Sequence, residues 1–193
     1  MNLTVDEIVK PVLAEDDVYI AGFQLENDVN VVCESIRRLH EAGIRTLLDP
    51  APAVPLLDWV YSCIIVIKPN EHEAALLSSI KINNTEDAFS AGRWFLNKGV
   101  ETAVITMGEN GTVVCGKDIR QYIETPTVDV IDTTGAGDIF SGSLMAALAE
   151  GKELIEAVKY ANIAASISVT QKGVYEATPT KEDVESYIKK YNL

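Results

Sequence analysis

The chain has 193 residues, of which 47% are hydrophobic and 23% are charged, and this balance excludes collagen-like, low-complexity and wholly disordered proteins. Its formal net charge of −13 at pH 7 is opposite in sign to that of surfaces that bind nucleic acids or anionic membranes. The three cysteines stand far apart, and no basic segment followed by an apolar run opens the chain. We therefore expect one domain spanning residues 1–193, in a reducing, cytoplasmic compartment.

Segments typical of strands and of helices alternate along the chain. After a short N-terminal helix, the pattern predicts the following elements: strands at 18–23, 45–49, 63–67 and 101–106, helices at 28–42, 71–77 and 85–99, two shorter and more polar strands at 112–115 and 119–124 forming an antiparallel edge, and helices at 135–150, 152–170 and 181–190. This alternation predicts an α/β fold in which a mainly parallel βαβ sheet carries helices on both faces.

Polar, Pro-rich or Gly-rich segments follow four of the predicted strands. They are residues 24–26, 49–52, 68–71 and 107–111. In a parallel sheet, ligands bind beyond the carboxyl ends of the strands, so we expect these four segments to lie along one rim and to form a binding site.

The most informative segment is Asp132-Thr133-Thr134-Gly135-Ala136-Gly137-Asp138, which leads into an apolar helix. The small residues at 135–137 allow a ligand to approach the backbone, and the N–H groups of the first helical turn favour an anion such as phosphate. The alternative is a simple cap in which Thr134 accepts from the backbone and Asp138 offsets the helix dipole, but it leaves the helix-destabilising glycines unexplained.

Two other phosphate-binding loops do not fit. No lysine follows the glycines, which excludes the P-loop, and Phe140 stands where the dinucleotide fingerprint needs its third glycine. A nicotinamide-dependent oxidoreductase is therefore not supported. Asp138 would repel a bound phosphate, but an ionised carboxylate there could accept the proton of a hydroxyl that attacks a phosphoryl group.

The segment 132–138 followed by Phe140-Ser141-Gly142-Ser143 resembles the C-terminal signature of the ribokinase-like (PfkB) sugar kinases. Further segments resemble the same family in the same order: 24–26, 49–53, 68–74, 106–111 and 169–173. The resemblance implies the fold of that family and ATP-dependent phosphorylation of a sugar hydroxyl, with ribose, phosphorylated to ribose 5-phosphate, as the first expectation. It also implies ATP and Mg²⁺ as cofactors, with K⁺ as an activating ion.

The resemblance also implies roles for individual residues. Asp138 would be the base that deprotonates the sugar hydroxyl, and Gly135, Ala136 and Gly137 would form an anion hole for the transferred phosphoryl group. The remaining assignments are Glu26 for the sugar, Asn70 and Glu73 for the phosphate–Mg²⁺ region through water, Thr106, Gly108 and Gly111 for the ATP phosphates and ribose, Asn162 for the adenine pocket, and Asp132, Thr134, Ser168 and Gly173 for K⁺. The spacing of Asn70 and Glu73 also fits a capped surface helix, and Asn162 also fits a polar residue on a helix flank.

Two departures from the family pattern bear on function. Ala177 stands near the place where family members often have a serine that helps to bind the monovalent ion. The resemblance also begins well into the family pattern, after its first Gly-rich signature, most of its sugar-contacting residues and the small β-lid that often forms a dimer. This leaves open a homodimer, a missing N-terminal half supplied by a partner in a split sugar kinase, or a truncated, non-catalytic nucleotide-binding module, and it predicts an unpaired sheet edge.

Overall fold

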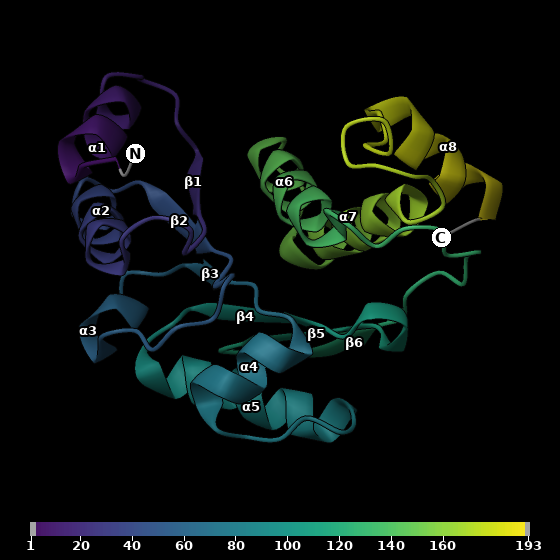
Figure 1. Cartoon of the computed structure of the whole chain (residues 1–193), viewed down its shortest axis with the longest axis horizontal. Coiled ribbons are helices and arrows are strands. Elements are labelled where there is room, and N and C mark those ends of the chain that lie inside the picture. Colours follow the sequence, from purple (N-terminus) through teal and green to yellow (C-terminus); the bar gives the residue numbers. More distant parts are fainter. Residues whose placement is uncertain (1–2, 192–193) are drawn as a thin grey trace. The chain divides into compact units, whose positions relative to one another are not determined.

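A computed structural model describes residues 3–191 and divides the chain into two units. The first, here called the sheet unit, runs to Gly108 and resumes at Thr112–Tyr122. The second, here called the helical unit, consists of Glu109–Gly111 and the chain from Ile123 onward. Figure 1 shows the strands and the first five helices in the sheet unit, and the last three helices in the helical unit.

A six-stranded sheet organises the sheet unit. Its strands, in spatial order, are β1 (Ile20–Phe23), β2 (Arg45–Leu48), β3 (Val66–Ile67), β4 (Thr102–Thr106), β5 (Thr112–Gly116) and β6 (Ile119–Ile123). The first four are parallel, in register pairs such as Phe23 with Leu48, and β5 is antiparallel to β4. This confirms the predicted α/β class with its mainly parallel sheet and antiparallel edge.

Each parallel strand is joined to the next by helical segments. The helices of this unit are α1 (Val5–Leu13), α2 (Val29–Glu41), α3 (Asp58–Tyr61), α4 (Glu71–Ser78) and α5 (Thr85–Lys98). Right-handed crossovers between sequentially ordered strands place the connecting helices on the same face of the sheet. A continuous core forms there, in which Ile36 and Phe95 from the helices pack with Leu48, Ile67 and Ile105 from the strands.

The local sequence explains where the helices begin and end. Asp28 caps α2 by accepting from the backbone N–H groups of Asn30 and Val31 at 2.9 and 3.3 Å. Helix α5 ends at Gly99, whose φ of 110° is in the left-handed region that glycine adopts readily. Asn84 caps α5, its side-chain oxygen accepting from the backbone N–H of Asp87 at 3.0 Å.

Two further predictions in this unit need correction. The strand predicted at 63–67 is assigned only at Val66–Ile67, because Cys63 and Ile64 close the turn of the unpredicted helix α3 by donating to the carbonyls of Val60 and Tyr61. The strand at 112–115, predicted to be polar, is buried throughout. Even Thr112, which has a polar hydroxyl group, is only 1% exposed.

The helical unit consists of α6 (Ala136–Ala149), α7 (Leu154–Ser168) and α8 (Lys181–Tyr191). Small residues let α6 and α7 pack closely, since Ala147, Ala157 and Ala161 are all fully or almost fully buried. Helix α8 packs on α7 through Val184, Ile163 and Ala164. Within the part of the chain that the structure describes, no helix has the length and apolar character needed to cross a membrane.

Helix α5 approaches strand β5 closely at Gly92, which predicts a size constraint at this position. A Cβ atom added at Gly92 of α5 would collide with the side chain of Cys115 on β5. We expect Gly92→Ala to lower the free energy of unfolding by about 1–3 kcal/mol, although alanine is the better helix former. Urea denaturation monitored by circular dichroism measures this change. The double variant Gly92→Ala/Cys115→Ala should recover part of the loss, and an equal loss in both would contradict the proposed collision.

Candidate active site

Four polar segments follow the four neighbouring parallel strands at one end of the sheet. The backbone N–H of Leu25 donates to the carbonyl of Ala51 at 2.8 Å, which brings the segment after β1 beside the segment after β2. The N–H of Thr106 donates to the carbonyl of Pro69 at 3.1 Å, which brings the end of β4 beside the segment after β3. The rim expected from the sequence is therefore present in the sheet unit as far as Gly108, and residues 109–111 belong to the helical unit.

A buried ion pair lies at the centre of this rim. Asp49 follows β2, Lys68 follows β3, and Lys68 Nζ lies 2.6 Å from Asp49 Oδ2. Each of these residues is 3% exposed. Such a pair is costly to desolvate and is retained only with close geometry, so it ties the ends of two strands together. The sequence predicts both residues on the rim but not their pairing, for which the available signal is an acid and a base directly after two consecutive buried strands.

Asn70 and Glu73 form a capping box at the start of α4. Asn70 Oδ1 accepts from the backbone N–H groups of His72 and Glu73, both at 2.9 Å, and Glu73 Oε2 accepts from the N–H of Asn70 at 2.8 Å. Burial raises the pKa of the Glu73 carboxyl, as does the nearby Asp49 carboxylate, while the Asn70 N–H and the Lys68 ammonium oppose this rise. The two side chains therefore lie together on the rim, and both take part in the cap that the sequence left as an alternative.

The other predicted site residues of the sheet unit lie on exposed or half-buried parts of the rim. Glu26 is exposed in the segment after β1. Thr106 ends β4 and forms a parallel bridge with Asn70. Gly108 begins a short 3₁₀ turn, with a φ of 56° and open space where a Cβ would stand. Gly111, which belongs to the helical unit, is buried and has a φ of 90°.

In the helical unit, Asp132 organises the loop before α6. Its Oδ1 accepts from the N–H and the hydroxyl of Thr134, at 3.0 and 2.7 Å, and its Oδ2 accepts from the N–H of Gly173 at 3.2 Å. The hydrogen bond from the Thr134 hydroxyl, followed by those from the two backbone groups, lowers the pKa of Asp132. The structure thus brings Thr134 and Gly173 together around the ionised carboxylate of Asp132.

The N-terminus of α6 is built from the small residues of this loop. Gly135 is the N-cap, with a φ of 76°, and no side chain caps the helix. A Cβ at Gly135 would lie 2.7 Å from Cγ1 of Val174, so both the backbone conformation and the space require glycine. Ala136 and Gly137 begin the helix, and Asp138 is exposed in its first turn.

Asn162 and Ser168 are buried on α7 and bond within the helical unit. Asn162 Nδ2 donates to the carbonyl of Glu124 at 3.0 Å, and its Oδ1 accepts from the hydroxyl of Thr125 at 3.2 Å. The hydroxyl of Ser168 donates to the carbonyl of Ala165, and the backbone carbonyl of Ser168 accepts from the N–H of Gln171 at 3.2 Å. Asn162 therefore fixes the segment that follows β6 against α7.

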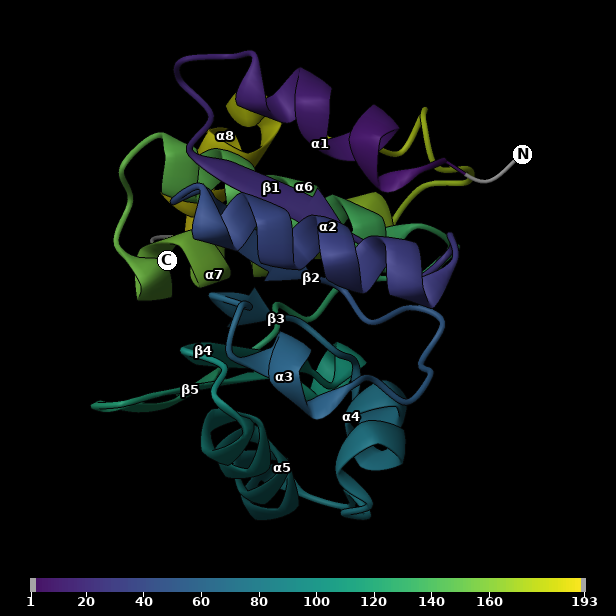
Figure 2. The same cartoon turned by 90° about the vertical axis from the view of Figure 1, so that its left-hand side faces the viewer.

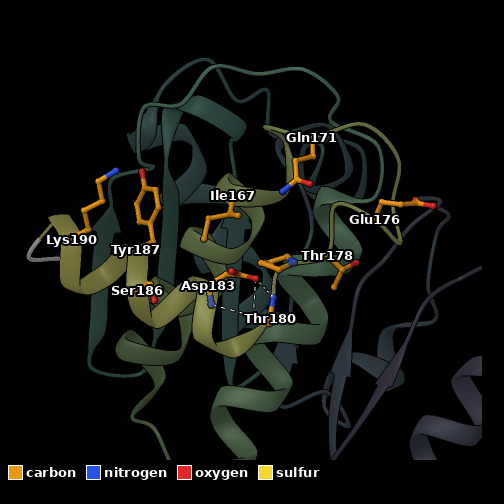
Figure 3. A pocket seen from close by; sticks show the side chains of 10 residues that line it. Ile167, Gln171, Glu176, Thr178, Thr180, Asp183, Ser186, Tyr187 and Lys190 are labelled. Carbon is orange, nitrogen blue, oxygen red and sulfur yellow. Dashed lines mark hydrogen bonds between the residues drawn. The ribbon is translucent and has the colours of Figure 1, made fainter.

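A pocket with a volume of about 550 Å³ lies between the C-terminal part of α7 and α8 (Figure 3). The residues that line it are Ile167, Gln171, Glu176, Thr178, Pro179, Thr180, Asp183, Ser186, Tyr187 and Lys190. None of them is among the site residues that the sequence predicts. Asp183 accepts from the N–H and hydroxyl of Thr180 at the start of α8, as Figure 3 shows, so its carboxylate has a structural role in the cap.

Comparison with known proteins matches residues 2–181 to the profile of the pfkB family carbohydrate kinases. A ribokinase from Haemophilus influenzae is 36% identical over 176 residues, which cover 91% of this chain and 57% of that protein. A deoxyribokinase from Salmonella typhi is 32% identical over 86% of this chain and 54% of its own length.

Solved structures agree with these sequence matches. A ribokinase from Thermotoga maritima superposes with a TM-score of 0.79 and 31% identity, over 89% of this chain and 57% of its own. The ribokinase of Arabidopsis thaliana, solved with ribose and ATP, gives a TM-score of 0.83 at 26% identity, over 88% of this chain and 55% of its own. The chain thus spans a little over half the length of the proteins that it matches.

The ion pair generates a prediction about stability. Lys68→Met leaves the Asp49 carboxylate buried without its cation, and we expect a loss of about 3–5 kcal/mol in the free energy of unfolding. In the double variant Asp49→Leu/Lys68→Met, no charge remains buried, so most of that stability should return. Urea unfolding of the three proteins measures the two differences. A double variant less stable than Lys68→Met would show that the pair is not the source of the effect.

The loop before α6 generates a second prediction. Gly135→Ala places a residue with a side chain in a left-handed backbone conformation and brings its methyl group against Val174. We therefore expect a loss of about 1–3 kcal/mol in the free energy of unfolding. The matched control is Gly142→Ala in the same helix, where open space surrounds the new methyl group. The free energy of unfolding of that control should equal that of the parent chain or exceed it by up to about 1 kcal/mol. Thermal unfolding compares the two, and equal effects would refute the constraint at Gly135.

Proposed function

The chain belongs to the pfkB family of carbohydrate kinases, and from that premise we propose that it supplies the nucleotide-binding part and the catalytic base of an ATP-dependent sugar kinase. The reaction transfers the terminal phosphoryl group of ATP to a sugar hydroxyl. We propose ribose, phosphorylated to ribose 5-phosphate, as the sugar, since relatives at 32–36% identity are named ribokinase or deoxyribokinase. We also propose that residues 1–193 act as one domain and that they act in the cytoplasm.

The single observation that carries this proposal is the N-terminus of α6. Gly135 is the N-cap and has no side chain that would lie over the first N–H groups of the helix, and Asp138 stands in the first turn. Such N–H groups are suited to the oxygens of a phosphoryl group, so Gly135, Ala136 and Gly137 would form the anion hole. Asp138 would accept the proton of the sugar hydroxyl. At the same time the hydroxyl oxygen would form a bond to the terminal phosphorus, and the bond between that phosphorus and the oxygen that remains on ADP would break.

The other residues that the family resemblance assigns to the site would bind the nucleotide and its metal ions. Thr106, Gly108 and Gly111 would lie along the ATP phosphates and ribose, Asn162 would line the adenine pocket, and Glu26 would contact the sugar. Asn70 and Glu73 present carbonyl and carboxylate oxygens on the rim, which suit an Mg²⁺ ion held through water. When bound, that ion neutralises charge on the phosphate oxygens.

The loop around Asp132 fits a monovalent cation in its donor chemistry. The Asp132 carboxylate has a lowered pKa, and the proposed set is completed by oxygens of Thr134, Ser168 and Gly173. Ala177 is buried and has no hydroxyl to add to this set. We therefore propose K⁺ binding with fewer ligands than in family members that have a serine near this position.

A second candidate is a module that binds nucleotide without phosphorylating sugar. It is favoured by the fraction of the relatives' length that this chain spans, 57% for the Haemophilus influenzae ribokinase. Assaying ribose phosphorylation by this chain alone separates the two. Turnover supports the kinase, and nucleotide binding with no turnover supports the module.

Nucleotide binding itself is tested by thermal unfolding. ADP with Mg²⁺ should raise the melting temperature, because a ligand that binds only the folded chain stabilises it by mass action, by about 2.7 kcal/mol at a concentration 100-fold above its Kd. AMP without Mg²⁺ is the control. An unchanged melting temperature at millimolar ADP–Mg²⁺ would count against both candidates.

The role of Asp138 is tested by Asp138→Asn. Loss of the base should lower the rate of sugar phosphorylation by about 10²–10⁴-fold while the melting shift with ADP–Mg²⁺ is retained. The matched control is Asp129→Asn, which removes an exposed carboxylate outside the loop and should leave the rate unchanged. Equal rates for Asp138→Asn and the parent chain would remove Asp138 from the mechanism.

A further inference from the structure

The pocket between α7 and α8 has no part in the proposed reaction. It lies within the helical unit and has a volume of about 550 Å³, in the range of sites that bind small organic molecules. Figure 1 and Figure 2 show the two helices from different sides. Helix α8 is fixed on α7 by Val184, which is 1% exposed, and Lys181 Nζ lies 2.7 Å from Oε1 of Glu150, which follows α6. The wall formed by α8 is therefore held in place.

An aromatic ring and an aliphatic side chain form the apolar part of this pocket. Ile167 of α7 and Tyr187 of α8 line it, and both are partly buried and pack against the core of the helical unit. Tyr191 packs on the Tyr187 ring, with the ring centroids 4.5 Å apart and the ring planes at 39°. The face of an aromatic ring carries partial negative charge, which attracts weakly positive C–H groups such as those of a sugar ring.

Two neutral polar groups flank this apolar surface. Figure 3 shows Ile167 between the side chains of Gln171 and Tyr187. Among residues 3–191, neither the Gln171 amide nor the Tyr187 hydroxyl forms a hydrogen bond. Burial raises the pKa of Tyr187, as does Tyr191, while the Lys190 ammonium opposes this rise, so the hydroxyl stays protonated at neutral pH. An amide and a hydroxyl each donate and accept, as the hydroxyl groups of a carbohydrate do.

The charges around the pocket do not suit an anion. One ammonium group, that of Lys190, is set against the carboxylates of Glu176 and Asp183. The hydrogen bond from the Thr180 hydroxyl, followed by that from the Thr180 N–H, lowers the pKa of Asp183, which is therefore ionised at neutral pH. A sugar phosphate or a nucleotide would meet these carboxylates and the net charge of −13 on the chain. A neutral ligand with several hydroxyl groups meets no such repulsion.

We propose that the pocket between α7 and α8 binds a small neutral carbohydrate, whose C–H groups pack on Ile167 and Tyr187 and whose hydroxyl groups exchange hydrogen bonds with Gln171. This site is separate from the N-terminus of α6, and its occupant is bound there without being phosphorylated. The inference goes beyond the proposed kinase reaction and does not depend on it, because it rests on the lining of the pocket alone.

The test is a titration of the isotope-labelled chain with D-ribose and, separately, with maltose, followed by amide NMR spectra. The amide signals of Gln171, Ser186 and Tyr187 should shift and reach saturation. The amides of residues 135–138 report a sugar that binds at the proposed catalytic site. A failure of one proposal is therefore distinguished from a failure of the other by which amides shift.

A pair of glutamine variants provides the matched control. Gln171→Leu keeps the approximate size of the side chain and removes its hydrogen bonds, so the Kd for the bound sugar should rise about 3–10-fold. Gln121→Leu makes the same change at an exposed position on β6, outside the pocket, and should leave the Kd unchanged. Circular dichroism shows whether each variant is folded. Equal Kd values for the two variants would contradict the proposed contact with Gln171.

The class of ligand is tested with D-ribose 5-phosphate, which differs from D-ribose by its phosphate group. It should bind in the pocket no more tightly than D-ribose, because of the carboxylates of Glu176 and Asp183. A Kd for the phosphate lower by at least about tenfold would identify an anion site and overturn the proposal. Pocket amides that show no saturable shift with either neutral sugar, or shifts confined to residues 135–138, would overturn it as well.

Discussion

The geometry of the rim depends on one constraint, which is that β1 to β4 are parallel and lie in sequence order. Each strand must therefore be followed by a return crossing, and the first residues of every return lie at the same end of the sheet. Polar residues that are far apart in the chain, such as Asp49 and Lys68, are brought into contact in this way. The rim exists because of the topology, and its side chains determine what it can bind.

The sequence predicts most of this topology because its signals are local and redundant. Helix α2 has an apolar stripe, an Asp28 cap and a glycine just after its end, and all three agree on its bounds. Helix α3 has none of these signals: its four residues have no side-chain cap, and an apolar run follows directly. The N–H groups of Cys63 and Ile64 close the turn of α3, so the strand begins later than predicted, and periodicity in so short a segment does not show this.

The candidate site is less predictable, since the same residue types serve structure and chemistry. Asn70 and Glu73 have the spacing of a capping box and form one, and this neither requires nor prevents a role toward a metal ion. The amide of Asn162 is bonded at both ends to residues 124 and 125, contacts that no sequence pattern indicates at a separation of 37 or 38 residues. Gly135 is different, because its left-handed backbone and the nearby Val174 leave no alternative to glycine. The backbone conformation and the space around it therefore explain why glycine stands at this position.

The buried pair of Asp49 and Lys68 also limits how this protein can evolve. A single replacement at either position leaves an opposite charge stranded in the interior, whereas a joint replacement by neutral residues leaves none. Drift at the two positions is therefore expected to be correlated, with the pair either kept together or lost together among descendants of this sequence. In the evolution of this protein, the residues that directly follow β2 and β3 would therefore be inherited as a pair.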